Sequence, residues 1–173
     1  MIRKLAMAVL MAAFIFPQTV NAVTESEAYE HNALINALNR AGVQVYADAD
    51  QCDAGIVNGF YHSPSKSLVV CNGGSKVMTD NNLDTLRHEA IHVVQDCKGG
   101  KLGDRIMARA MNPGEAVRLL RRSGFDPDAV RAAYKARGVS DSVVQLEFEA
   151  WGGAANLRPE QITLALDTYC GSK

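Results

Sequence analysis

The chain contains 173 residues, of which 18 are basic and 19 acidic, so its formal net charge at pH 7 is only −1. Without an excess of basic residues, the chain lacks the electrostatic footprint of a general nucleic-acid binder, and we expect no nucleic-acid partner. Hydrophobic residues make up 47% of the sequence, enough for a chain of this length to bury the core of one ordinary domain. No internal repeat, low-complexity tract or linker divides it.

The first 22 residues have the pattern of a secretory signal peptide. Arg3 and Lys4 give a basic start, and an apolar run follows from Leu5 to Phe16. Small residues then precede a predicted cleavage point after Ala22. The apolar run is too short to span a bilayer comfortably, which disfavours the alternative of an uncleaved membrane anchor. Cleavage would leave residues 23–173 as a single domain with 16 basic residues against 19 acidic ones, a net charge of −3.

The next part of the chain predicts one helix and then a small sheet. Apolar residues recur at helical spacing between Glu25 and Ala41, and Gly42 ends this helix. Ser63 to Lys66 has the composition of a turn between strands. Three short segments favour strands: Val43 to Tyr46, Gly55 to Tyr61 and Ser67 to Cys71.

A second helix, capped by Thr79 or Asp80, contains the pattern His-Glu-x-x-His at His88, Glu89 and His92. On a helix this spacing places the two imidazoles one turn apart on the same face, where both can bind one Zn²⁺. Glu89 lies about 100° round the helix, where it can act as a general base without taking a coordination position. Most neighbouring residues are uncharged, so we expect a buried helix whose polar groups need a partner. The alternative, a surface helix with two solvated histidines, would carry charges between them.

The C-terminal half is predicted to be helical. Asn112-Pro113 and Asp126-Pro127 each place a capping side chain before a proline at the first helical position. Two more helices are expected to begin at Ser140 or Asp141 and at Pro159. The order of helix, small antiparallel or mixed sheet, central helix and helical C-terminal half predicts an α+β fold.

Four cysteines lie in the part of the chain that would be exported. An even number in an oxidising compartment indicates two disulfides. Three pairings are possible, of which we favour Cys52 with Cys71 across neighbouring strands and Cys97 with Cys170. A structural zinc site is the alternative, but the spacings contain no Cys-x-x-Cys.

Residues Thr85 to Val94 resemble the extended signature of the zincin metallopeptidases, in which Thr or Val opens the motif and the positions between and after the histidines are uncharged. The Gly and third His of the metzincin branch do not follow His92. The resemblance implies a zincin-like fold, Zn²⁺ as cofactor and hydrolysis of peptide bonds in a peptide or protein substrate. It covers only this stretch of the chain.

A catalytic zinc site needs a third protein ligand and an open position. Glu147 and Glu149 lie on an otherwise apolar predicted helix, about 200° apart, so at most one can face the metal. In the gluzincin branch, which this arrangement resembles, a small residue follows the glutamate ligand after three positions. Ala150 has that spacing from Glu147, so Glu147 is the predicted ligand and Glu149 the alternative; both could instead be solvated. His31 is interpreted as solvent-facing and His62 as a strand-end residue.

These residues predict an exported zinc metallopeptidase. Glu89 would take a proton from the zinc-activated water and pass it to the leaving amine. Tyr61, His62 and Tyr134 are candidate donors to the developing oxyanion. Two alternatives stay open: a zinc-binding protein of this fold without turnover, and a zinc hydrolase of a non-peptide substrate. Glu89 argues against the first, because a purely structural site needs the histidines but not the base.

Three further expectations concern the surroundings of the site. Asp84 and Asp96, one turn before and after the histidines, are candidates to accept a ring N–H of a metal ligand. The strand Ser67 to Cys71 matches by position the strand that aligns substrate in zincins, so it is expected to pair with an extended peptide. We expect a periplasmic or secreted monomer with no stable membrane association.

Overall fold

The computed structural model describes residues 24–54, 57–74 and 79–171, so the predicted signal peptide lies outside the described residues. The helices are α1 (Glu25–Arg40), α2 (Asp80–Gly99), α3 (Pro113–Arg122), α4 (Pro127–Lys135), α5 (Asp141–Asn156) and α6 (Pro159–Cys170). The strands are β1 (Gln44–Ala47), β2 (Gly59–His62) and β3 (Ser67–Val70). The fold is therefore α+β, with a small sheet and mostly helical content.

Local sequence signals explain where the helices begin. Thr79 caps α2 by accepting the Asn82 backbone N–H, and the Asn82 side chain accepts the Thr79 N–H in return. Asn112 and Asp126 cap α3 and α4, each followed by a proline at the start of the helix. Ser140 caps α5. Each of these side chains satisfies a backbone N–H that has no partner within the helix.

The strands of the described residues form one mixed sheet in the order β1-β3-β2, with β1 parallel and β2 antiparallel to β3. The turn between β2 and β3 ends at Lys66 in the left-handed conformation, with φ of 52°. Because β3 is paired on both sides, the expectation that Ser67 to Cys71 binds an extended peptide is wrong. The edge strand that packs on α2 is β2.

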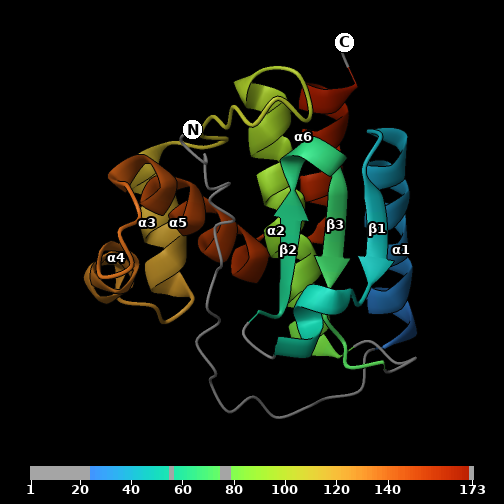
Figure 1. Cartoon of the computed structure of the whole chain (residues 1–173), viewed down its shortest axis with the longest axis horizontal. Coiled ribbons are helices and arrows are strands. Elements are labelled where there is room, and N and C mark those ends of the chain that lie inside the picture. The colour runs from blue at the N-terminus through green and yellow to red at the C-terminus, as the bar shows by residue number, and fades with distance from the viewer. Residues whose placement is uncertain (1–23, 55–56, 75–78, 172–173) are drawn as a thin grey trace, which may run out of the picture.

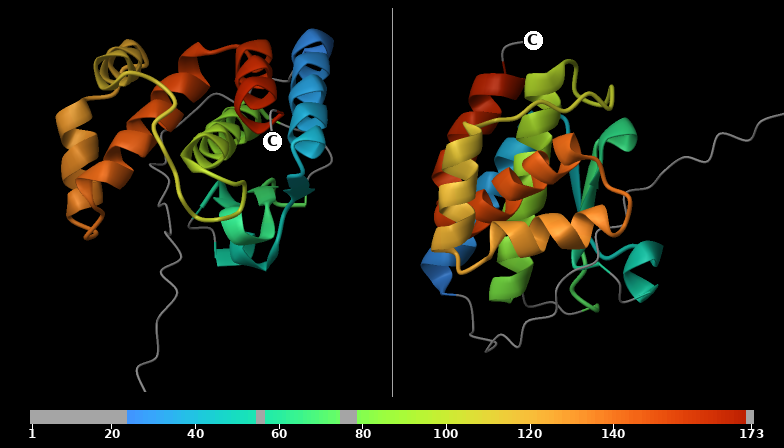
Figure 2. Two further views of the ribbon diagram at one scale, coloured as in Figure 1. Left: turned by 90° about the horizontal axis from the view of Figure 1, so that it is seen from above. Right: turned by 90° about the vertical axis from the view of Figure 1, so that its left-hand side faces the viewer.

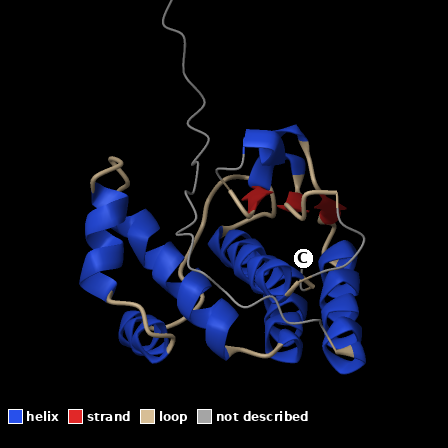
Figure 3. Ribbon diagram, turned by 90° about the horizontal axis from the view of Figure 1, so that it is seen from below, coloured by secondary structure: helices blue, strands red, loops and turns tan. Residues whose placement is uncertain are grey.

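Helix α2 is the centre of the molecule. The sheet lies on one side of it, and α1, α6 and α5 lie around the rest (Figures 1 and 2). Seen from below, the strands form a layer next to α2 and α1 (Figure 3). Every residue from His88 to Cys97 is buried. A helix enclosed on all sides explains why uncharged residues surround the His-Glu-x-x-His pattern.

Helix α5 connects two hydrophobic cores. Ala150 belongs to the core around α2, whereas Val144 and Phe148 belong to a second core with α3 and α4. Two glycines allow α5 to approach α3 and α2 closely. A Cβ on Gly152 would lie 2.9 Å from the Leu120 backbone nitrogen of α3, and one on Gly153 would lie 2.5 Å from the Ile91 Cδ1 of α2.

Two disulfides link Cys52 to Cys71 and Cys97 to Cys170, so the favoured pairing is confirmed. Cys52 lies in a 3₁₀ turn, Asp50–Ala54, rather than on a strand. Disulfides are rare in the cytosol and indicate an oxidising, non-cytoplasmic compartment. Among the helices that the structure describes, none combines the length and apolar character of a membrane span.

Candidate metal centre

The side chains of His88, His92 and Glu147 meet between α2 and α5. The two histidine Nε2 atoms are 3.2 Å apart. The Glu147 carboxylate oxygens lie 3.6 Å from His88 Nε2 and 3.5 Å from His92 Nε2. All three side chains are buried, and the group could hold a metal ion.

The packing of α5 on α2 sets the position of Glu147. Gly153 of α5 packs on Ile91 of α2, and Gln95 of α2 donates a hydrogen bond to the Leu146 carbonyl at 3.0 Å. Glu147 therefore faces the histidines, while Glu149 points elsewhere on the helix. Glu149 accepts hydrogen bonds from Gln95 Nε2 at 3.1 Å and from the Ala110 backbone N–H at 2.7 Å.

Gln95 holds His92 in one tautomer. Its Nε2 donates to Leu146 and Glu149, which only accept, so its Oε1 is the atom 2.8 Å from His92 Nδ1. An amide oxygen accepts, so His92 carries its proton on Nδ1 and presents the Nε2 lone pair to the other two side chains. Sequence reasoning missed Gln95, because only acidic neighbours of the histidines were considered.

The two acids expected to support the histidines have other partners. Asp96 is fully buried and accepts hydrogen bonds from the Tyr61 hydroxyl at 2.7 Å and the Gly103 N–H at 3.0 Å. Asp84 forms an ion pair with Arg87. Both acids therefore stabilise packing around α2, and among the described residues their side chains bind groups other than His88 and His92.

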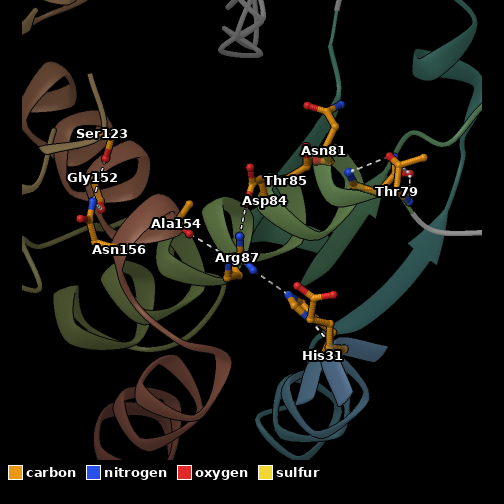
Figure 4. A network of polar contacts seen from close by, with 12 residues as sticks. His31, Thr79, Asn81, Asp84, Thr85, Arg87, Ser123, Gly152, Ala154 and Asn156 are labelled. Atoms are coloured by element: carbon orange, nitrogen blue, oxygen red, sulfur yellow. Dashed lines mark hydrogen bonds and ion pairs between the residues drawn. The ribbon is translucent and has the colours of Figure 1, made fainter. Parts of the chain in front are cut away.

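His31 is buried, so its interpretation as solvent-facing was wrong. It is 4% exposed, and its Nε2 accepts a hydrogen bond from Arg87 at 3.0 Å, as the close-up in Figure 4 shows. Arg87 also donates to the Ala154 carbonyl at 2.8 Å and so links α1, α2 and α5. Burial lowers the pKa of His31, and the neighbouring Arg87 lowers it further, although the Glu27 carbonyl opposes the shift.

Glu89 is buried beside the group formed by His88, His92 and Glu147. Burial raises the pKa of its carboxyl to about 8; Glu147 adds to this, and the Tyr61 backbone N–H opposes it. Its Oε2 is buried without a hydrogen-bond partner among the described residues. Gly59 brings β2 to this position, because a Cβ there would lie 2.5 Å from the Thr85 side chain of α2.

Aromatic side chains close the other side of the group. The Trp151 ring packs edge-on against His88 with centroids 4.6 Å apart, and burial lowers the pKa of His88 to about 3. Tyr134 donates to Glu147 at 3.0 Å and accepts from Trp151 Nε1 at 3.1 Å. Of the three candidate donors, the structure brings Tyr134 to the group.

The side chains of the other two candidate donors, Tyr61 and His62, have partners outside this group. The Tyr61 hydroxyl is bound to Asp96. His62 is exposed at the end of β2 and contacts Ser65 at 2.7 Å. The position of His62 agrees with its interpretation as a strand-end residue.

The fold and site define an α+β protein with a buried His-His-Glu group that could hold a metal ion. The chain belongs to a family described as a domain of unknown function (DUF8637), which residues 23–170 match. No curated protein and no solved structure matches it.

Proposed function

We propose that this protein is an exported zinc-dependent peptidase of the zincin type, in which His88, His92 and Glu147 bind the metal and Glu89 is the general base. The observation that carries the proposal is the convergence of three buried ligand atoms beside a fourth buried group, the Glu89 carboxylate. The pattern His-Glu-x-x-His and the register of Glu147 with Ala150 give the same assignment from sequence.

The spacing of the ligand atoms supports zinc. At Zn–N and Zn–O distances of 2.0–2.1 Å, the corners of a tetrahedron are about 3.3–3.4 Å apart. The observed separations are 3.2 Å, 3.5 Å and 3.6 Å. The two longer separations end on different oxygens of Glu147, Oε2 for His88 and Oε1 for His92. One ligand atom from each of the three residues lies within 4.8 Å of the others, and three protein ligands would leave a fourth position for water or substrate, as in catalytic zinc sites.

The charge of the site also favours a dication. Glu89 and Glu147 are 4% and 1% exposed, and no Lys or Arg of the described residues forms an ion pair with either. Buried carboxylates without a cation are costly, and burial raises the pKa of both. Both histidines are held neutral by burial, as metal ligands must be.

Zinc supplies Lewis acidity and lowers the pKa of bound water towards neutrality. Glu89, whose carboxyl has a pKa of about 8 without metal, would take up the water proton and deliver it to the leaving amine. Tyr134 donates its hydroxyl proton to Glu147, and it would have to release that bond to donate to a substrate oxygen. Gln95 fixes the His92 ring.

The peptide would be recognised along β2. This strand pairs with β3 on one side, and its residues Phe60 and His62 lie opposite Val69 and Ser67. The Tyr61 N–H points the other way, towards Glu89. An extended substrate added at this edge would lie beside the proposed base, and main-chain pairing gives recognition with little side-chain specificity.

Two measurements on the protein purified after export test the proposal. Elemental analysis should find about one zinc per chain. His88→Ala and Glu147→Gln should lower the zinc content, whereas Glu149→Gln, an identical change two positions away, should not. Hydrolysis of an unfolded protein substrate should fall at least about 100-fold in Glu89→Gln while zinc stays bound.

The outcomes separate the alternatives. Wild-type protein without zinc after chelator-free purification would overturn the metal assignment. Bound zinc with no hydrolysis of any peptide would favour a binding protein or a hydrolase of another substrate. Full activity in Glu89→Gln would exclude the proposed mechanism.

A further inference from the structure

We propose that a cavity lined by α5, the helix that carries Glu147, binds a carboxylate group of the peptide substrate, so that the enzyme prefers peptides with an acidic residue or a free C-terminus at that position. The inference rests on the proposed function for the nature of the ligand, a peptide. The cavity has a volume of about 670 Å³ and lies between segment 105–109 and the first half of α5.

The cavity shares helix α5 with the proposed zinc ligand Glu147. Val143, in its wall, lies one helical turn before Glu147 on the same face of α5. Leu146, also in the wall, directly precedes Glu147, and its carbonyl accepts the hydrogen bond from Gln95. The α5 residues of the wall therefore all lie within about two helical turns of Glu147 along the same helix.

The charge at the cavity is positive. Arg105 and Arg109 line it, and neither forms an ion pair with a described residue. Burial raises the pKa of Glu149, and its hydrogen bonds with Ala110 and Gln95 oppose that shift more strongly than the nearby Arg109 does. The one acidic lining residue, Asp141, is bound to Arg131 and Lys135 at 3.3 Å and 3.0 Å.

The backbone that carries the two arginines is anchored on both sides of the cavity. The Arg105 N–H donates to Ser63 Oγ at 3.2 Å, and the Ala108 N–H donates to the Gln95 carbonyl at 2.9 Å. The Ala110 N–H is bound to Glu149. The segment, drawn in yellow, crosses from the end of α2 to α3 (Figure 2). The arginines are thus exposed side chains on a fixed backbone.

The lining matches a carboxylate on an apolar body. Met107, Val143 and Leu146 provide apolar surface, and the guanidinium groups provide paired N–H donors whose geometry fits a carboxylate. A peptide offers such a group either as its C-terminal carboxylate or as an Asp or Glu side chain. The chemistry is the same, so the experiment must separate these two sources.

NMR titration of the zinc-loaded Glu89→Gln protein tests the proposal without turnover. N-acetyl-leucine and N-acetyl-leucinamide differ only in a terminal carboxylate. N-acetyl-leucyl-glutamyl amide and its glutaminyl counterpart differ only in a side-chain carboxylate. We expect the acid of at least one pair to bind about tenfold more tightly than its neutral partner, with shifts at Met107 and Val143. The pair that shows the difference identifies the source.

The arginine variants distinguish this cavity from other anion sites. Arg105→Gln combined with Arg109→Gln should abolish the preference, whereas Lys101→Gln, which removes an exposed cation outside the cavity, should leave it unchanged. Equal binding of acids and amides in both pairs would overturn the proposal. A preference that survives in the arginine variant would also overturn it, because the carboxylate would then be held elsewhere, for example on the metal.

The failure of this proposal is separable from that of the proposed function. An arginine-dependent preference in a protein that never hydrolyses peptides would overturn the peptidase assignment alone. A zinc peptidase without the preference would overturn the cavity assignment alone.

Discussion

The side-chain oxygen of Gln95 accepts the Nδ1–H of His92 at 2.8 Å, and this one contact decides which ring nitrogen of His92 is free. The same glutamine donates to Leu146 and Glu149 on α5. Gln95 therefore orients one proposed ligand while it ties together the two helices that carry the site. A buried amide with three partners is a specific arrangement, because each unsatisfied group would cost free energy.

Gln95→Leu should weaken zinc binding about 10–100-fold, because His92 would lose the partner that holds its tautomer and ring orientation. Competition with a chelator of known affinity measures this. Asp96→Asn is the matched control, since Asp96 is also fully buried but binds Tyr61 and Gly103. We expect zinc affinity in that variant to stay within about threefold of wild type. An equal loss in both variants would show that general packing, rather than the His92 contact, determines affinity.

Glu89 should make the metal-free protein less stable at high pH. Its carboxyl has a pKa of about 8 in the folded state against an ordinary value of 4.5. Below 4.5 both states are protonated. Between pH 4.5 and pH 8 the unfolded state has lost the proton that the folded state keeps, so the free energy of unfolding falls over this range and levels off above pH 8. Glu89→Gln should therefore stabilise the metal-free protein by roughly 2–4 kcal/mol at pH 8 and much less at pH 5.

Urea unfolding in the presence of a chelator at the two pH values measures this difference. Glu149→Gln provides a second buried glutamate variant for comparison. An equal stabilisation by Glu89→Gln at pH 5 and pH 8 would contradict the assigned pKa.

His31 should make the protein sensitive to mild acid. Its folded-state pKa lies below the ordinary value, so as pH falls the unfolded state binds the proton first. The contribution of the neutral His31 side chain to the free energy of unfolding is fully present above about pH 6.5 and is lost as the pH falls below that value. His31→Gln should flatten the fall in unfolding free energy between pH 7 and pH 5 by up to about 1 kcal/mol. The exposed His62 provides the matched control, His62→Gln, for the replacement of a histidine side chain.

The two glycines of α5 should respond differently to alanine. At Gly152 the new Cβ would meet the backbone of α3, which cannot move without disturbing the helix. Gly152→Ala should destabilise the protein by about 1–3 kcal/mol. At Gly153 the nearest atom is Ile91 Cδ1, the end of a side chain that can rotate, and alanine favours the helix by roughly 0.5–1 kcal/mol. Thermal unfolding that ranks Gly153→Ala as the more damaging change would contradict this packing.

The disulfides should contribute unequally to stability. Cys97–Cys170 closes a loop of 73 residues and Cys52–Cys71 one of 19. Loop entropy gives about 4.4 kcal/mol for the first and about 3.2 kcal/mol for the second. Double alanine replacement of each pair, followed by urea unfolding, tests the order. The reverse order would indicate that the shorter disulfide acts mainly by holding the folded end of the sheet.

The sequence alone determined the features that depend on neighbours along the chain. Capping residues such as Thr79 and Asn112 predicted helix starts, because a cap acts within one turn. Helical spacing put His88 and His92 on one face, and the same geometry separated Glu147 from Glu149. These rules need no knowledge of what packs against the helix.

Only the tertiary structure determined which residues pack against those helix faces. The order β1-β3-β2 put β3 in the middle of the sheet and made β2 an edge strand beside α2, because strand order depends on contacts between distant segments. His31 is buried and bound to Arg87, a residue 56 positions away along the chain. Gln95 presents its oxygen to His92 because α5 supplies acceptors for its amide nitrogen. Burial, hydrogen-bond partners and the cavity lined by α5 are properties of packed surfaces, and no local pattern of residues encodes them.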